Sequence, residues 1–431
     1  MKGKIKLRPL KGFRDLTGGY VKIRQRFIEE ARKISEIYGF EEVVTPTVEP
    51  YELYAAKSGE EIVHRMYEFK DLGGRHVVLR PEVTASIARL VAEKYRGRPL
   101  PIKLFYVANV FRFDEPQRGR YREFTQIGYE IVGSRYPEAD VEILDISRRL
   151  FEKFNLKYEF KMGHEGVLRG LLRKGGCNES TINKILGYLD RQEYGKARRL
   201  MEKNIREEVS SVVWKLLNLR GYDWREILES SEKLISFSED AEKAIENLRE
   251  IVEMAYSSGF REGTIYLDLG FARGLEYYTG MIFEVYLEGL NIAVDGGGRY
   301  DELCEIFGYD VPAVGCAVGV DRVMLKLEEA LKLEEPKEVM VIAVGEKNVK
   351  KAIEISKIFR DRGIRTLMDL MRRRVRAGMT YALKRGVRYI VYVGDKEILG
   401  NYITIRDTKT RKEGKIQIDK LEKWLKETEM S

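Results

Sequence analysis

Three arginines stand where chemistry on a charged substrate would need them, each near the end of an expected strand or the start of an expected helix. Arg112 follows an apolar strand, Arg273 lies in the loop LGFARGLEYYTG, and Arg322 opens a helix. The chain has only three histidines, and its three cysteines form no CxxC pair. We therefore expect no histidine base, no Ser–His–Asp relay, no zinc cage and no disulfide. Guanidinium groups without an activated nucleophile suit phosphate chemistry that depends on positioning and charge neutralisation.

Arg322 has no local reason for its position. It follows Asp321 at the expected start of a helix, where a positive charge opposes the helix dipole at a cost of ~0.3–1 kcal/mol. Asp321 is expected to cap that helix, but the arginine gains nothing from its neighbours in sequence. An anion held by Arg322 and the helix N-terminus, such as a nucleotide phosphate, would explain the placement.

The segment Phe105–Gly133 predicts the wall of a pocket. It reads as two β-strands joined by a charged turn around Asp114–Gly119. With period-2 alternation, one face of the second strand carries Arg122, Phe124, Gln126, Gly128 and Glu130. The opposite face carries Tyr121, Thr125, Ile127, Tyr129 and Ile131. The first set is too polar for a core and too aromatic for a solvated face, so we expect a polar pocket in which Gly128 leaves room for a ligand. A hairpin with one wet face is the alternative.

Two further stretches carry candidate binding residues. In LRPEVTAS, Glu82 precedes a helix that Thr84 can cap, although the helix dipole alone would also explain a carboxylate there. Tyr277 and Tyr278 follow the loop arginine, and aromatic hydroxyls beside a guanidinium suit a small polar ligand, while surface loops use tyrosine too. The triple glycine in DGGGRYDELCEIFG (295–308) either lets the backbone approach a ligand or makes a tight turn. It is not a P-loop, because no GK[ST] follows.

The expected elements favour an α+β fold with a second, smaller domain. Strands are expected at 41–47, 77–80, 264–269, 281–287, 291–295 and 313–318, and helices at 23–38, 84–95, 139–154 and from 321 onward. Antiparallel-type strands with helices packed on one side argue for an α+β core. Residues from about 175 to 255 read as a helical insertion in it. We expect this domain to span 1–334.

Residues 339–431 read as a separate α/β domain after the linker KLEEPKE (332–338). Strands at 339–344, 364–368 and 388–393 alternate with helices at 347–362 and 372–385, which predicts a mostly parallel sheet. This segment holds 23 Lys and Arg against 12 Asp and Glu, whereas the whole chain has 77 against 69. The basic surplus points to a polyanion, most simply nucleic acid, or else to a solubilising charge bias. The cluster Arg372, Arg373, Arg374 and Arg376 would contact phosphates or form a solvated helix face.

No apolar run approaches the ~18 residues that span a membrane. The basic N-terminus has no apolar core of a secretory signal. We therefore expect a cytoplasmic protein that does not interact with membranes.

Five segments resemble motifs of one known family. FRFDEPQRGRYREFTQIGYE resembles the second signature motif of class II aminoacyl-tRNA synthetases. GFEEVVTPTVEP (39–50) is similar to the first motif, which builds the dimer interface, and AVGCAVGVDRVM (313–324) to the third. Within that class, RGLEYYTGMIFE (273–284) and RPEVT (80–84) resemble sequences of histidyl-tRNA synthetases. The resemblance covers residues 1–330 apart from the insertion, and the C-terminal domain resembles the family's anticodon-binding domain.

The resemblance implies a role for each candidate residue. Arg112 would hold the ATP α-phosphate, Phe124 and Arg322 would enclose the adenine, and Arg322 would also meet the γ-phosphate. Arg120 would face the substrates. The residues implied to bind histidine are Glu82, Thr84, Gln126, Glu130, Tyr277 and Tyr278. Arg273 would stabilise the α-phosphate as the histidine carboxylate attacks it, with Mg²⁺ relieving further charge.

The implied activity is that of a histidine–tRNA ligase, which activates L-histidine with ATP and transfers it to the 3′ end of tRNA(His). The implied partners are L-histidine, ATP, tRNA(His) and a second copy of the chain as a homodimer. No metal-ligating residue is expected. The alternative is a non-catalytic, synthetase-like regulatory subunit of histidine biosynthesis, the partner of an ATP phosphoribosyltransferase. That subunit lacks the anticodon-binding domain and tends to lose the arginines of the motifs. This chain keeps the motif arginines and a C-terminal domain that resembles the anticodon-binding domain.

Overall fold

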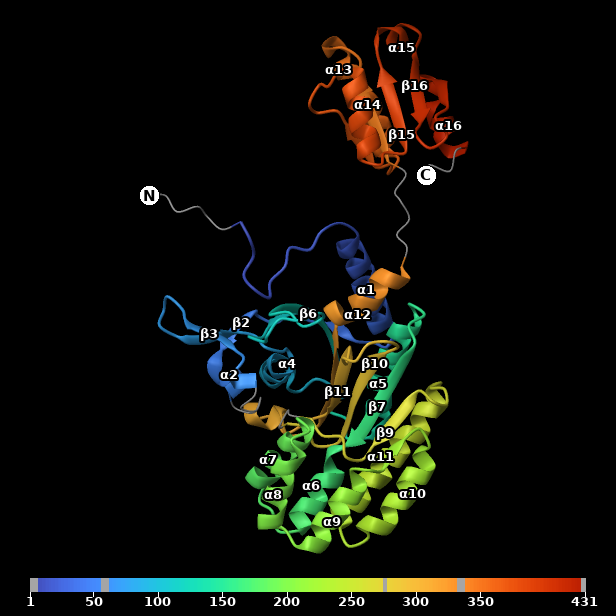
Figure 1. The fold of residues 1–431 in the computed structure, drawn as a ribbon. Helices are drawn as coiled ribbons and strands as arrows, with labels where there is room; N and C mark the ends of the chain where they lie inside the picture. The colour runs from blue at the N-terminus through green and yellow to red at the C-terminus, as the bar shows by residue number, and fades with distance from the viewer. Residues whose placement is uncertain (1–6, 56–61, 274–276, 332–337, 428–431) are drawn as a thin grey trace. The chain divides into compact units, whose positions relative to one another are not determined.

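The computed structural model describes residues 7–55, 62–273, 277–331 and 338–427. The chain divides into two compact units, Met1–Lys332 and Leu333–Ser431, drawn in Figure 1. Three residues of the RGLEYYTG motif (274–276) and most of the expected linker (332–337) lie outside the described residues. Within the described parts, no helix is long and apolar enough to cross a membrane.

A nine-stranded sheet forms the centre of the first unit. In spatial order its strands are β1 (Glu41–Glu42), β5 (Ile102–Phe111), β6 (Glu123–Val132), β12 (Ala313–Gly319), β11 (Asp295–Arg299), β10 (Met281–Leu287), β7 (Tyr158–His164), β9 (Ile265–Asp268) and β8 (Arg220–Gly221). The β1–β5 and β7–β9 pairs are parallel, and the other pairs of this sheet are antiparallel. The α+β class expected from the sequence is thus confirmed.

Helices cover one face of this sheet and bury the apolar side of β6. They include α1 (Gly18–Ile37), α5 (Pro137–Glu152) and α12 (Val320–Ala330). Ile127, Tyr129 and Ile131 of β6 lie in that core and are at most 1% exposed. The alternating residues Phe124, Gln126 and Glu130 face the opposite side, where they line a pocket. The two faces predicted for this strand are confirmed.

A small antiparallel sheet and two short helices lie beside β5. The sheet has the order β2 (Val48–Pro50), β4 (His76–Leu79), β3 (Tyr67–Lys70), and the helices are α2 (Tyr51–Ala55) and α4 (Thr84–Leu90), which continues as a π-helical turn η1 (Val91–Tyr95). The strand expected at 41–47 is wrong beyond Glu42. The Val43 N–H still donates to the carbonyl of Phe105 at 2.8 Å. Farther along, Pro46 has no N–H to donate, and the carbonyls of Thr45 and Pro46 accept hydrogen bonds from the Arg80 side chain rather than from a strand.

The strand expected at 291–295 is also displaced, since β11 begins at Asp295 and contains the triple glycine. These glycines do not make a turn. A Cβ on Gly297 would lie 2.1 Å from the carbonyl oxygen of Gly315, and one on Gly298 would lie 2.5 Å from that of Met281. Side chains are therefore excluded where β11 approaches its two neighbours.

The expected helical insertion packs at the β7–β9 edge of the sheet. Its elements are α6 (Glu165–Lys174), α7 (Glu179–Asp190), α8 (Tyr194–Asn204), α9 (Glu207–Leu216), α10 (Trp224–Ile235) and α11 (Glu239–Ser258), with the edge strand β8 between α9 and α10. A 3-10 turn, η2 (Cys304–Phe307), follows β11. Figure 1 shows α6 to α11 gathered below the sheet.

The second unit is a five-stranded sheet with a helix on each face. Its order is β14 (Thr366–Met368), β13 (Val339–Ala343), β15 (Tyr389–Val393), β16 (Tyr402–Asp407), β17 (Glu413–Gln417). The first three strands are parallel, as expected, and α13 (Val349–Asp361) and α14 (Val375–Lys384) pack on opposite faces. The antiparallel pair β16–β17 was not predicted. The remaining elements are η3 (Glu346–Asn348), α15 (Asp395–Leu399), η4 (Ile418–Lys420) and α16 (Leu421–Glu427).

Candidate active site

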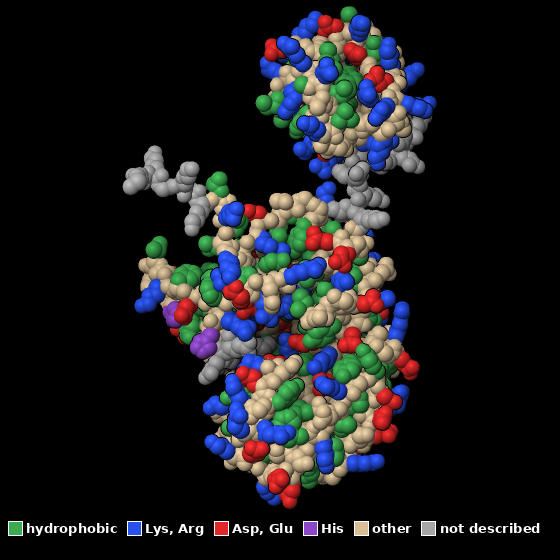
Figure 2. Space-filling model, viewed as in Figure 1, with side chains coloured by type: hydrophobic (Ala, Val, Ile, Leu, Met, Phe, Trp, Pro, Cys, Tyr) green, Lys and Arg blue, Asp and Glu red, His purple; other side chains and the backbone are tan. Residues whose placement is uncertain are grey.

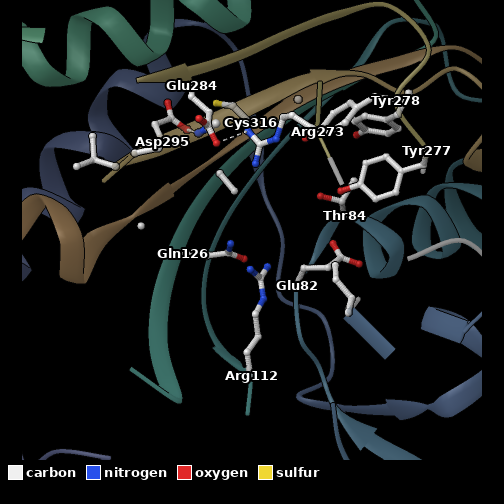
Figure 3. Close-up of a pocket in the computed structure, with 18 of the residues that line it drawn as sticks. Glu82, Thr84, Arg112, Gln126, Arg273, Tyr277, Tyr278, Glu284, Asp295 and Cys316 are labelled. Carbon is white, nitrogen blue, oxygen red and sulfur yellow. Dashed lines mark hydrogen bonds and ion pairs between the residues drawn. The ribbon is translucent and has the colours of Figure 1, made fainter. Parts of the chain in front are cut away.

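The polar face of β6 forms one wall of a cavity of about 240 Å³, shown in Figure 3. Strands β6, β12, β11 and β10 supply its floor, and α4 and the loop before β10 supply its sides. Ten of the eleven predicted site residues line it: Glu82, Thr84, Arg112, Phe124, Gln126, Glu130, Arg273, Tyr277, Tyr278 and Arg322. The strand order brings them together from positions 240 residues apart.

Arg120 is the predicted site residue that does not line the cavity. It is exposed in the loop between β5 and β6, where its Nε lies 3.8 Å from Oδ2 of Asp114. Its charge nevertheless reaches the site, because it contributes to lowering the pKa of Arg322.

Glu130 is buried with hydroxyl donors on both carboxylate oxygens. Thr84 Oγ1 donates to Oε1 at 2.9 Å, and the Tyr300 hydroxyl donates to Oε2. Thr84 is thus not a helix cap as predicted. The N-cap of α4 is Val83, and the Thr84 hydroxyl donates its hydrogen bond to the Glu130 carboxylate. Burial raises the pKa of Glu130 to about 8, although both hydroxyl donors favour its charged form.

Gly128 does not leave room for a ligand, contrary to the expectation from alternation. It lies opposite Tyr106 in the β5–β6 ladder, and a Cβ on it would lie 2.0 Å from Cζ of that ring. The space that the missing side chain leaves is filled by the neighbouring strand. Gln126 and Glu130 consequently stand on either side of a buried tyrosine.

The amide of Gln126 and the carboxylate of Glu82 point at the cavity from opposite walls (Figure 3). Gln126 is 8% exposed, and its buried Oε1 has no hydrogen-bond donor among the described residues. The Glu82 carboxylate also accepts a hydrogen bond from the backbone N–H of Ala85 at 3.2 Å. The alternative role considered for Glu82, an interaction with the helix N-terminus, is therefore present as well. Burial raises the pKa of Glu82. Both groups can receive a polar substrate.

The paired tyrosines close the cavity on the side of α4. The rings of Tyr277 and Tyr278 lie 5.0 Å apart between centroids, and Tyr277 makes an edge contact with Tyr300 at 5.9 Å. Burial raises the pKa of both phenols, that of Tyr278 to about 12. They are therefore neutral hydroxyls at physiological pH, able to donate or accept a hydrogen bond.

Arg112 and Arg322 carry positive charge into the cavity without a carboxylate partner among the described residues. Arg112 donates to the carbonyl of Pro81 at 2.8 Å and lies 5.5 Å from the Phe124 ring centroid. Arg322 donates to the carbonyl of Ala293 at 2.7 Å. Burial lowers the pKa of both guanidinium groups, and repulsion from Arg112 and Arg120 helps to lower that of Arg322 to about 10. Partly buried cations that repel one another favour the binding of an anion.

Arg273 stands apart from that pair, beside two acidic residues. Its Nη1 donates to the carbonyl of Phe283 at 3.1 Å and lies 3.6 Å from Oε1 of Glu284. Burial acts to lower the pKa of Arg273, but the charges of neighbouring groups, including Glu284, hold it above its ordinary value. Asp295, on the adjacent strand, also lines the cavity, and burial raises its pKa to about 6.

Several lining residues were not among the predictions. Tyr300 lies inside a stretch that was singled out for its glycines, and only the contact with Glu130 reveals its importance. Gly315 faces Glu130 across β12, where a Cβ would lie 1.6 Å from Oε2. Asp190 comes from the end of α7, and no signal in the sequence connects that helix with the pocket.

Comparisons with known proteins identify the family of each unit. Residues 12–323 match the family described as Histidyl-tRNA synthetase, and residues 338–428 match the Anticodon binding domain. The "Histidine--tRNA ligase" of Methanocaldococcus jannaschii is 36% identical over 95% of this chain and 97% of its own length. That of Saccharolobus solfataricus is 33% identical over 98% of this chain and 100% of its own.

Solved structures share the fold. The histidyl-tRNA synthetase from Nostoc sp. PCC 7120 superposes with a TM-score of 0.78 at 22% identity, over 98% of this chain and 100% of that one. A Bacillus halodurans structure described as an ATP phosphoribosyltransferase regulatory subunit/histidyl-tRNA synthetase also gives 0.78, at 26% identity, over 91% of this chain and 100% of its own.

The sheet, the arginine-lined pocket and the second unit define an aminoacyl-tRNA synthetase. The chain belongs to the histidyl-tRNA synthetase family. It is an enzyme, and its activity is that of a histidine–tRNA ligase. The regulatory-subunit alternative is less well supported, since the curated relatives reported above are ligases and the chain matches the anticodon-binding family.

Proposed function

We propose that the cavity activates L-histidine with ATP through the following residues. Arg112 and Arg322 receive the triphosphate, and Phe124 and Arg322 enclose the adenine. Two partly buried guanidinium groups that lack carboxylate partners among the described residues support this assignment, because a triphosphate provides the missing negative charge. Arg120, exposed beside the cavity, adds positive potential at its mouth.

Histidine occupies the opposite end of the cavity in this proposal. Glu130 accepts the imidazole N–H, and Gln126 and the hydroxyl groups of Tyr277 and Tyr278 complete the site for the histidine side chain. Glu82 and Thr84 bind the α-amino group, whose positive charge matches the buried carboxylate. The substrate carboxylate then points toward Arg273.

The reaction is an in-line displacement at the α-phosphorus. A carboxylate oxygen of histidine forms the new P–O bond, and the bond to the pyrophosphate leaving group breaks. Arg273 stabilises the negative charge that develops there, and Glu284 holds its guanidinium in place. In the second step, a ribose hydroxyl of the tRNA(His) 3′ end attacks the activated carbonyl and AMP leaves.

Mg²⁺ would enter with ATP rather than on a preformed protein site. The described residues contain no group of three or more His, Cys, Asp or Glu suited to a metal ion. Glu284 and Asp295 fit the pattern of one or two carboxylates that complete the coordination of a phosphate-bound Mg²⁺. The ion would neutralise charge on the leaving pyrophosphate.

A homodimer and a cytoplasmic location complete the proposal. The segment that resembles the dimer-building motif, together with the end of α1, leaves large apolar side chains exposed, with Val44 at 88%, Ile37 at 76% and Val48 at 45%. A second copy of the chain would cover them. We propose a cytoplasmic location because the reaction uses ATP and tRNA.

ATP–pyrophosphate exchange with each of the twenty amino acids tests the proposed function. Exchange should require histidine and fail in the variant Arg112→Ala. Exchange that is independent of histidine would exclude the proposed specificity.

A further inference from the structure

Residues 10–14, called here the N-terminal strap, precede α1 and lie against the loop between β5 and β6 (residues 112–122). The backbone N–H of Arg122, at the end of that loop, donates to the carbonyl of Gly12 at 2.9 Å. Gly12 has a φ of 88°, and a Cβ on it would lie 2.6 Å from Cγ of Arg122. Lys11 pairs with Glu115 of the same loop. The strap and the loop are therefore in direct contact, at a point where only glycine fits.

A buried carboxylate at the start of α12 binds the strap as well. Asp321 was expected to cap this helix, but the N-cap is Gly319 and no side chain caps it. The Asp321 carboxylate instead accepts hydrogen bonds from other elements. The Arg14 guanidinium and the Tyr20 hydroxyl, the latter at 2.9 Å, donate to Oδ1, and the backbone N–H of Thr125 donates to Oδ2 at 2.9 Å. One buried acid thus joins the strap, α1 and β6 to α12.

This junction adjoins the residues proposed to enclose the adenine. Arg322 follows Asp321 in the chain, and Phe124 precedes Thr125. The hydrogen bond between Asp321 and Thr125 therefore fixes the backbone of α12 relative to β6 at positions adjacent to both side chains. A shift at the junction would change the distance between the Arg322 guanidinium and the Phe124 ring.

Arg14 also contacts the β5–β6 loop through its flat face. Its Cζ lies 3.2 Å from the ring centroid of Tyr121, which belongs to that loop. The tip of the loop reaches α12 directly, because a Cβ on Gly119 would lie 2.9 Å from Cδ1 of Leu325. Arg14 consequently bridges two elements that already touch each other, and both of them border the nucleotide site.

The Arg14–Asp321 pair differs from the ion pairs on the surface around it. Figure 2 shows Lys and Arg side chains among Asp and Glu side chains where Figure 1 places the strap and α12. In the pair of Lys11 with Glu115, the side chains are 66% and 77% exposed, and such pairs contribute little to stability. In the Arg14 pair they are 29% and 5% exposed. Loss of Arg14 therefore removes a cation from a buried carboxylate.

We propose that Arg14 is a positioning residue for the ATP site. By binding Asp321 and covering Tyr121, it holds the start of α12 and the β5–β6 loop at the spacing that the nucleotide requires. Arg14 is not among the residues that line the cavity, so it acts through others. The inference rests on the proposed function, since it takes Arg322 and Phe124 as the residues around the adenine.

The Michaelis constants of the full-length protein test this role. Arg14→Ala should raise the KM for ATP in histidine-dependent ATP–pyrophosphate exchange by about 5- to 50-fold, because the binding groups are no longer held in register. The KM for histidine should stay within about twofold. A merely structural lesion reduces the fraction of active enzyme, and this lowers kcat without changing either KM. An unchanged KM for ATP, or a KM for histidine that rises equally, would overturn the proposal.

Lys11→Ala is the matched control. It removes the same charge from the same strap, and its partner also belongs to the β5–β6 loop. Because that pair is exposed, the KM for ATP should stay within about twofold of wild type. Arg14→Lys keeps a cation for Asp321 but lacks the flat face for Tyr121, so it should recover only part of the ATP affinity. Equal effects of Lys11→Ala and Arg14→Ala would overturn the proposal.

A double variant tests the bridge between the loop and the helix. If Arg14 acts by joining Tyr121 to Asp321, then Arg14→Ala combined with Tyr121→Leu should raise the KM for ATP by less than the product of the two single effects. Effects that multiply would show that the two residues act independently, and this would overturn the proposal.

Failure of the proposed function would look different. The wild-type protein would then show no histidine-dependent exchange, whereas the Kd for ATP, measured by calorimetry in wild type and Arg14→Ala, would still test the strap. Normal exchange in the wild type, with an unaltered KM for ATP in Arg14→Ala, would remove only the present inference.

Discussion

Gly315 and Glu130 face each other across the β12–β6 ladder so closely that a Cβ on the glycine would lie 1.6 Å from the carboxylate. The carboxylate occupies the space that a side chain at 315 would take. The absence of that side chain is therefore part of how the buried acid is held.

Gly315→Ala should displace Glu130 and weaken histidine use. The KM for histidine in ATP–pyrophosphate exchange should rise by at least about tenfold, because the carboxylate loses its hydroxyl donors when it moves. The KM for ATP should change much less. Gly414→Ala is a suitable control, since a Cβ there meets no atom within 4 Å. A KM for histidine that stays at the wild-type value would contradict the assignment of Glu130.

The histidine site should depend on pH through Glu130. Its pKa of about 8 means that the empty pocket carries a proton there below that pH. Bound histidine requires the carboxylate as an acceptor, so binding releases the proton and is favoured as the pH rises. kcat/KM for histidine should increase up to about pH 8 and then level off.

Glu130→Gln provides the control for that profile. Titration of free histidine affects both proteins equally, so the difference between their profiles isolates the carboxylate. The variant should have a lower kcat/KM and lack the rise toward pH 8. Parallel profiles would show that another group titrates.

How much of this site the sequence predicts depends on where each residue lies in the chain. Alternation within β6 places Phe124, Gln126 and Glu130 on one wall, because period 2 is a local property of the backbone. The same reasoning fails at Gly128, because the ring that fills its space belongs to Tyr106 on another strand. The register of β5 against β6, which sets Tyr106 opposite Gly128, cannot be read from the sequence of either strand alone.

The remaining errors have the same origin. Tyr300, Asp190 and Gly315 enter the site through long-range packing, and no motif in the sequence relates them to Glu130 or Arg273. The triple glycine was expected either to let the backbone approach a ligand or to make a tight turn. In the structure it instead lets β11 approach the two strands beside it. The roles of the predicted residues in the reaction remain predictions that the kinetics must test.

Arg273→Ala should reduce the rate of adenylate formation by about 100-fold or more, with a smaller effect on histidine affinity. The guanidinium is expected to act on charge that develops during the displacement, so its loss affects kcat more than KM. Single-turnover measurement of adenylate formation is the appropriate readout. Arg273→Lys should restore only part of the rate because it lacks the planar fork. A rate unchanged in the alanine variant would remove the assigned role.

The arginine cluster of the second unit should act on tRNA alone. Arg373 is engaged, since it pairs with the buried Asp369 and lies 4.1 Å from the Tyr381 ring. Arg374 and Arg376 are exposed and form no ion pair among the described residues. Replacing both with alanine should raise the KM for tRNA and flatten its salt dependence, while histidine activation stays unchanged.

Lys350→Ala on α13 controls for the loss of positive charge from the same unit. It should leave tRNA affinity close to wild type. If Lys350→Ala and the double variant weaken binding equally, the cluster acts only through overall charge.

The position of β12 has a consequence for how the protein is made. This strand is the last of its sheet to leave the ribosome, yet it lies in the middle, between β6 and β11. Until roughly residue 320 has emerged, the two halves of the sheet have no common partner. A nascent chain that ends earlier therefore lacks the strand that joins β6 to β11, and with it one wall of the catalytic pocket.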